Sequence, residues 1–258
     1  MISHHHKCVF IHIPKNAGQS IEHVFFDLLG LTYETRAPLL MMPNDKPELG
    51  PPRLAHLKWH EYVGCKYMPQ EQFDSYFKFA FVRNPWDRAV SIYKYYKFHK
   101  KCSYSDFVEK NLGDWMWRDK QWFVGPQMDF ICDDDGALKV DFLGRFERLN
   151  DDFKQVCVQI GLPPIDLPHV NLSVPKAKTA QDQPKRSVRG ELKKIWRGRS
   201  AEDFPTFSRY QEYYDARTRD LVAELYQRDI ERFGYQFEAA SEPRPADRPG
   251  IQTASSAQ

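Results

Sequence analysis

The feature that most constrains the fold is a short apolar segment that leads through a tight turn into an amphipathic helix. Residues 8–13 (CVFIHI) are mostly apolar, as expected for a strand buried in a parallel sheet. Residues 14–19 form the turn, and from Ser20 apolar residues recur at the three- and four-residue spacing of a helix that packs on a sheet. Such a unit is typical of α/β proteins.

A second unit of the same kind follows. Residues 77–82 (FKFAFV) read as a strand, Asn84 as a helix N-cap and Pro85 as the first position of a helix that runs to about residue 98. Further elements are expected as a strand near 140–146, a helix from about 150 and a last helix over about 211–233. Strands that alternate with helices predict an α/β fold with a mainly parallel central sheet flanked by helices.

We expect one domain over residues 1–238. Residues 239–258 contain three prolines and no aromatic residue, which predicts a disordered tail. Residues 1–7 include three successive histidines and are expected to form a flexible surface terminus.

Composition excludes several classes of protein. The chain has 258 residues with 37 basic and 35 acidic side chains, and a net charge of +2 does not indicate a general polyanion binder. The five cysteines form no CxxC motif, which excludes zinc-ribbon and thioredoxin-like sites. A signal-peptide pattern is absent, and so is an apolar run of about 18–20 residues that could span a membrane. We therefore expect a cytoplasmic protein without a nucleic-acid partner.

The turn after the first strand has the properties of an anion site. A helix N-terminus offers unpaired N–H groups and the positive end of the helix dipole. Lys15 adds a full charge, Gly18 allows close approach of the backbone, and Ser20 adds a hydroxyl. The Walker A pattern GxxxxGK[ST] is absent, which disfavours an ordinary magnesium ATPase. The alternative is a plain turn with a surface lysine.

The turn after the second strand offers another cation. Arg83 lies where that strand ends, the edge at which ligands of α/β sheets bind, and its planar guanidinium suits a phosphate. Ser91 could add a hydroxyl from the following helix, and Arg88 lies nearby as a second cation. The alternative is that Arg83 only pairs with Asp87. Two such turns in one sheet predict a ligand with two separate anionic groups.

Taken together, the two turns resemble the motifs of a known enzyme family. Residues 10–21 (FIHIPKNAGQSI) resemble the 5′-phosphosulfate loop of sulfotransferases, and residues 81–93 (FVRNPWDRAVSIY) resemble their 3′-phosphate motif. Residues 141–147 (DFLGRFE), 213–215 (YYD) and 226–237 are similar to later segments of the carbohydrate-type group, sulfotransferase family 2. The resemblance extends from about residue 8 to 238.

The resemblance implies a single P-loop-like domain and a donor, 3′-phosphoadenosine 5′-phosphosulfate (PAPS), which leaves 3′-phosphoadenosine 5′-phosphate (PAP) as product. Lys15 would contact the 5′-phosphosulfate and steady the leaving phosphate, and Arg83 and Ser91 would hold the 3′-phosphate. The cradle for the 5′ group would be formed by Asn16, Ala17, Gly18, Gln19 and Ser20. Asn16 and Gln19 depart from the family pattern, which commonly has threonine at both positions.

Sulfuryl transfer to an alcohol requires a base, and histidine suits this role near neutral pH. His56 lies in a segment (RLAHLK) that resembles the family segment carrying the base, and His60 is the second candidate if both lie on one helix face. His12, within the first strand, is expected in the core. No metal site is expected, because His56 and His60 have no evident third ligand and the HExxH order is missing.

Residues 176–199 contain nine basic and two acidic side chains, a local charge of +7. We interpret them as a basic insertion or lid that binds an anionic polysaccharide or the donor phosphates, or else as a solvated face.

The sequence thus predicts a sulfotransferase that transfers the sulfuryl group from PAPS to a hydroxyl acceptor, expected to be a carbohydrate, by in-line attack. The alternatives are a P-loop kinase-like enzyme and a polyanion-binding module that uses residues 176–199.

Overall fold

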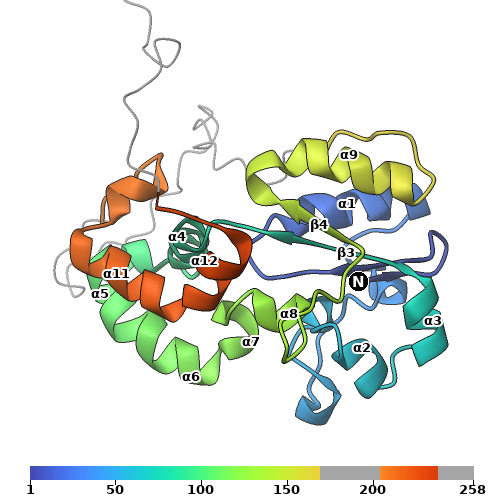
Figure 1. The fold of residues 1–258 in the computed structure, drawn as a ribbon, viewed down its shortest axis with the longest axis horizontal. Coiled ribbons are helices and arrows are strands. Elements are labelled where there is room, and N and C mark those ends of the chain that lie inside the picture. The colour runs from blue at the N-terminus through green and yellow to red at the C-terminus, as the bar shows by residue number, and fades with distance from the viewer. Residues whose placement is uncertain (169–203, 238–258) are drawn as a thin grey trace, which may run out of the picture.

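The computed structural model describes residues 1–168 and 204–237, which form a mixed α/β fold around a central sheet (Figure 1). The sheet of this described part has four strands in the order β1-β2-β3-β4. Strands β2 (Cys8–Ile11), β3 (Phe77–Val82) and β4 (Phe142–Arg145) run parallel, and the short β1 (Ile2–Ser3) pairs antiparallel with β2. The predicted α/β class with a mainly parallel sheet is confirmed.

The register of the sheet brings the two predicted turns to one edge. Ile11 at the end of β2 pairs with Ala80 of β3, and Val82 at the end of β3 pairs with Arg145 of β4. The carboxyl ends of β2 and β3 therefore lie side by side, so the loop that contains Lys15 and the residue Arg83 share one edge of the sheet. This is the edge at which open α/β sheets bind ligands.

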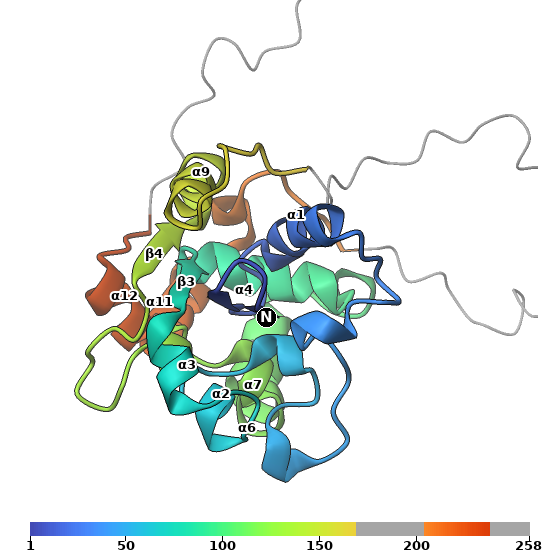
Figure 2. The same cartoon turned by 90° about the vertical axis from the view of Figure 1, so that its right-hand side faces the viewer.

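Helices cover both faces of the sheet. Helices α1 (Gly18–Leu29) and α9 (Leu149–Gln159) lie together on one face in both views (Figure 2), and their apolar side chains pack with Phe10, Phe79 and Phe81. Helix α4 (Pro85–Tyr95) packs on the other face, where Val9, Ile11, Ala80 and Val82 point. Successive strand residues point to opposite faces, which explains the continuously apolar strand sequences.

Short helices complete the described part of the chain. They are α2 (Glu61–Gly64), α3 (Gln70–Ser75), α5 (Tyr104–Phe107), the π-helical η5 (Val108–Met116), α6 (Trp117–Asp119), α7 (Gln121–Val124), α8 (Met128–Ile131), α11 (Ala216–Leu225) and α12 (Gln227–Phe233). The 3-10 turns are η1 (Ala37–Leu39), η2 (Pro47–Leu49), η3 (Leu54–His56), η4 (Phe98–Lys100), η6 (Phe146–Arg148) and η7 (Tyr210–Tyr213). None of these described helices is both long and apolar enough to cross a bilayer.

Two sequence predictions about elements were wrong. The expected helix over 211–233 is divided into η7, α11 and α12, because the Asp215 side chain caps α11 by accepting from Thr218 N at 2.7 Å and Tyr226 interrupts the helix with φ −115°. The amino terminus is not a flexible surface segment, since Met1 and Ile2 are buried and β1 pairs with β2. The basic segment 176–199 and the predicted tail 239–258 lie outside the described residues.

Candidate functional site

The loop between β2 and α1 has an unusual backbone. Lys15 and Ala17 both adopt left-handed conformations, with φ of 72° and 61°, which cost a non-glycine residue about 1–2 kcal/mol each. Turns of this kind direct successive N–H groups into a concavity that suits an anion. Helix α1 begins at Gly18 with no side-chain cap and no acidic residue in its first turn, so the positive end of its dipole is not neutralised locally.

Gly18 permits close packing between the start of α1 and His12. A Cβ atom at Gly18 would lie 2.0 Å from Nε2 of His12, which is closer than any real contact. The glycine therefore allows the imidazole to lie directly against the loop. Of the residues 16–20 predicted to form the anion cradle, Ala17, Gln19 and Ser20 are half-buried or exposed.

Lys15 lies half-buried with its ammonium beside an aromatic ring. Its Nζ is 4.3 Å from the centre of the Tyr95 ring, within the range of a cation–π contact. Burial, with a smaller contribution from the charge of Arg83, lowers the pKa of Lys15 to about 8. The side chain is thus still mainly charged at neutral pH.

Arg83 makes the ion pair considered from the sequence and a second contact. Its Nε and Nη2 both lie 2.8 Å from Asp87 Oδ2, and Nη1 donates to the Lys15 carbonyl at 3.0 Å. The guanidinium also stacks over Phe146 at 3.8 Å. Three of its five N–H donors are used, which leaves two for a ligand. Ser91 is half-buried on the same helix, α4.

Arg88 is not a second cation at the ligand-binding edge. It is fully buried, and its guanidinium donates to the carbonyls of Pro14 (3.0 Å), Gly125 (2.8 Å) and Phe123 (2.9 Å). These contacts connect Pro14, the residue before Lys15, to the C-terminal end of α7. Arg88 therefore supports the loop from within.

Asn16 also points into the protein. It is 1% exposed, and its Nδ2 donates to the Phe81 carbonyl and to Gln127 Oε1, both at 2.7 Å. The side chain ties the loop to strand β3 and to the residue before α8. Only the backbone of Asn16 can therefore contribute to an anion cradle in this arrangement.

His56 and His12 form a buried histidine pair next to this loop. Nδ1 of His56 lies 3.0 Å from the His12 carbonyl, and the two rings meet edge-on with centroids 4.5 Å apart. Because a carbonyl can only accept, Nδ1 of His56 carries the hydrogen and Nε2 is left as the basic atom. Burial, and then the neighbouring His12, lowers the pKa of His56 well below 6.5, so the ring is neutral at neutral pH.

The sequence prediction that His12 is a core residue is confirmed by its 5% exposure, but the residue also has a carboxyl partner. Its Nδ1 lies 2.6 Å from Glu22 Oε1 on α1, which is likewise buried. His12 thus contacts Glu22, His56 and Gly18, and it joins the predicted base to the predicted loop. Glu22 was missed from the sequence, although a carboxylate on the buried side of α1 is a detectable signal.

His60 is separated from this pair. Leu57 is extended and divides η3 from α2, so His56 and His60 do not share a helix face. His60 is exposed and touches the ring of Trp59. Within residues 1–168 and 204–237, no group of three or more histidine, cysteine or carboxylate side chains could hold a metal ion.

Aromatic side chains connect His56 with Lys15. Trp122 and Phe123 lie 5.9 Å and 6.1 Å from the His56 ring, and Phe123 stacks on Tyr95 at 5.3 Å. Tyr95 in turn contacts the Lys15 ammonium. A ligand between the loop and His56 would therefore meet aromatic surfaces as well as charge.

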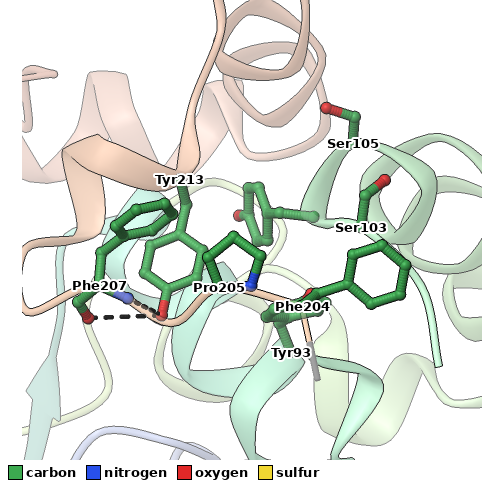
Figure 3. Close-up of a pocket in the computed structure, with 8 residues that line it drawn as sticks. Tyr93, Ser103, Ser105, Phe204, Pro205, Phe207 and Tyr213 are labelled. Carbon is green, nitrogen blue, oxygen red and sulfur yellow. Dashed lines mark hydrogen bonds between the residues drawn. The ribbon is translucent and has the colours of Figure 1, made fainter. Parts of the chain in front are cut away.

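A separate pocket lies at the C-terminal end of α4 (Figure 3). It has a volume of about 140 Å³ and is lined mainly by aromatic side chains, with the Tyr213 hydroxyl bonded to the backbone of Phe207. Its lining residues are Tyr93, Ser103, Tyr104, Ser105, Phe204, Pro205, Phe207 and Tyr213. None of the site residues predicted from the sequence lines it.

The profile of the sulfotransferase family matches residues 1–236, which is nearly the whole chain. The chain belongs to sulfotransferase family 2. Family membership makes it a transferase of the sulfotransferase class, in agreement with the resemblance of the two turns. A protein of Archaeoglobus fulgidus, described as an uncharacterized protein, is 35% identical over 96 residues, which cover 35% of this chain and 72% of that protein. No solved structure matches the chain.

Proposed function

We propose that this sulfotransferase transfers the sulfuryl group of PAPS to the hydroxyl of a carbohydrate, with His56 as the base. Residues 1–238 would form one P-loop-like catalytic domain, and the protein would act in the cytoplasm. The family match supports the reaction class. The donor follows from the family resemblance, and the acceptor and the residue roles are inferred from the geometry of the site.

One observation carries the proposal: the hydrogen bond from Nδ1 of His56 to the His12 carbonyl. It leaves Nε2 as the proton acceptor, and the low pKa of the ring keeps that atom unprotonated at neutral pH. Because His12 also packs against Gly18, the base lies next to the start of α1.

The residues of the loop fit a phosphosulfate group. A left-handed turn, an uncapped twelve-residue helix and a lysine that is half-buried provide N–H groups and charge, and the first turn of α1 has no acidic residue. Arg83, held at the neighbouring strand end with two free donors, fits a second phosphate. Ser91 would add its hydroxyl from α4. When bound, PAPS supplies the sulfuryl group together with a phosphate leaving group.

The chain's own groups then perform three tasks. His56 Nε2 takes the proton of the acceptor hydroxyl while its oxygen bonds to sulfur and the bond from sulfur to the phosphate oxygen breaks. Lys15 and the first N–H groups of α1 stabilise the negative charge that grows on the departing phosphate. Trp122 and the 42% exposed Tyr95 offer flat surfaces for a sugar ring near His56, which favours a carbohydrate acceptor.

Calorimetry with PAP tests the donor assignment. We expect the native protein to bind PAP and Arg83→Ala to bind it at least about tenfold more weakly, because a desolvated charge-assisted contact is lost. Arg118→Ala is the matched control, since Arg118 pairs with Asp114 at the same spacing but is exposed. Absence of PAP binding to the native protein would refute the donor.

Turnover tests the base. We expect His56→Ala to lose about a hundredfold or more in kcat with PAP affinity retained, since general-base catalysis commonly contributes that much. His60→Ala, in an exposed histidine four residues away, is expected to keep full activity. Full activity of His56→Ala would remove His56 from the role.

A further inference from the structure

The two anion-binding turns are joined by one buried side chain that belongs to neither. Gln127, which is 0% exposed, lies directly before α8. Its Oε1 accepts from Asn16 Nδ2 at 2.7 Å and from the Arg83 N–H at 2.9 Å, and its Nε2 donates to the Arg83 carbonyl at 2.8 Å. One amide thus bonds to the loop after β2 and to the residue after β3.

Gln127 is itself fixed by the C-terminal part of the fold. Its backbone N–H and that of Met128 donate to the two carboxylate oxygens of Asp229 on α12, at 2.7 Å and 2.9 Å. Asp229 is also 0% exposed, and the buried Arg88 interacts with it electrostatically. The amide of Gln127 is therefore held at a defined position relative to both turns.

This arrangement has a consequence for ligand binding. The loop with Lys15 and the residue Arg83 follow different strands, and the pairing of β2 with β3 ends at Ile11 and Ala80. Beyond these residues the side-chain bonds of Gln127 and Asn16 and the bond from Arg83 to the Lys15 carbonyl hold the two turns together. Hydrogen bonds are directional, and a buried polar group that loses its partner costs free energy. These bonds therefore fix the distance between the two turns.

We propose that Gln127 is a positioning residue that sets the separation between the two anion-binding turns. It thereby makes the site selective for a ligand with two anionic groups at a fixed distance, such as a nucleoside 3′,5′-bisphosphate, over a monophosphate. The inference rests on the proposed function, because it takes the Lys15 loop and Arg83 as the two phosphate subsites. A preorganised pair of subsites binds more tightly because less ordering is required at the moment of binding.

The test compares two probes on three proteins. For Gln127→Met, which keeps the volume but loses all three bonds, we expect the Kd for PAP to rise about tenfold. For adenosine 5′-monophosphate, which engages one turn, we expect a change below about threefold. Gln121→Met, which changes an exposed residue of the neighbouring helix α7, is the control and is expected to bind both probes as the native protein does.

Each outcome decides a different question. If the native protein does not bind PAP, the proposed function fails. If the native protein binds PAP, two results would refute the positioning role. The first is that Gln127→Met binds PAP as tightly as the native protein does, and the second is that the substitution lowers the affinity for both probes by the same factor. Should Gln127→Met not fold, Gln127→Asn replaces it, since it keeps the amide but is one methylene too short to bond both turns, and the same loss of bisphosphate selectivity is expected.

Discussion

Lys15 is a cation in surroundings that disfavour its charge. Burial and the nearby Arg83 lower its pKa to about 8, while the Tyr95 ring and the Arg83 bond to its carbonyl hold it at the loop. An anion that binds beside such a lysine would stabilise its charged form further. Its protonation should therefore be linked to ligand affinity.

The predicted linkage has a definite sign. Lys15 is half protonated near pH 8, so PAP affinity should fall about twofold from pH 7 to 8 and more steeply above it, by up to about tenfold per pH unit. Calorimetry across pH 7–10 measures this. His56 is already neutral throughout this range and does not contribute. Lys15→Arg, whose guanidinium stays charged, should move the decline to higher pH. A flat profile for the native protein would contradict the prediction.

At the scale of elements, the start of helix α1 requires a glycine at its first residue. The Cβ direction of Gly18 points into the His12 ring, so the helix can begin here only without a side chain. From the sequence, Gly18 is expected to let the backbone approach a ligand closely. The structure adds a second reason: the start of α1 packs against His12, whose carbonyl accepts the hydrogen bond from His56.

Gly18→Ala should therefore disturb both the loop and the histidine pair. Overpacking at such a contact costs about 1–3 kcal/mol, and for a chain of this size each kcal/mol lowers the Tm by about 2–4 °C. We also expect weaker PAP binding, because the His12 ring or the loop must move. Gly64→Ala, at an exposed residue of α2 with no atom near the added Cβ, should leave the Tm and PAP affinity unchanged or slightly raise the Tm. Thermal unfolding of both variants measures the difference, and equal Tm values would contradict it.

Elements with strong local signals could be predicted from the sequence. Strand β3 was predicted with its observed bounds, since six apolar or aliphatic-stemmed residues end at the Asn84-Pro85 helix start. The single helix expected over 211–233 was wrong because apolar periodicity continues through Tyr226, whose side chain instead bonds to the Val124 carbonyl at 2.7 Å. The Asp215 cap was a readable signal for the start of α11, whereas the Tyr226 bond depends on a segment about a hundred residues away.

At the scale of the whole molecule, the candidate site is assembled from segments that the sequence treats separately. Lys15 and Arg83 could be predicted because each follows its own strand. Gln127 and Asp229 could not, because their partners lie 111 and 102 residues away and a buried amide or carboxylate leaves no local pattern. Sequence reasoning therefore identified Lys15 and Arg83, the residues that we propose face a ligand, and missed those that hold them in place.

The C-terminal part of the described chain belongs to this supporting structure, which leads to a prediction about truncation. Asp229 bonds to the segment before α8, Phe237 packs on Trp86, and the Gln236 carbonyl accepts from Asn84 at 3.1 Å. A chain that ends at residue 226 loses all of these contacts and leaves two N–H groups of the Gln127 segment without their acceptor. We expect it to be insoluble or unfolded by circular dichroism.

A chain that ends at residue 238 keeps every one of these contacts. Residues 239–258, with three prolines and no aromatic side chain, offer little apolar surface for burial. We therefore expect the chain of 238 residues to match the full chain in Tm and in PAP affinity, which places the boundary of the catalytic domain after Phe237. A lower Tm or weaker PAP binding in this shorter chain would show instead that the last twenty residues take part in the domain.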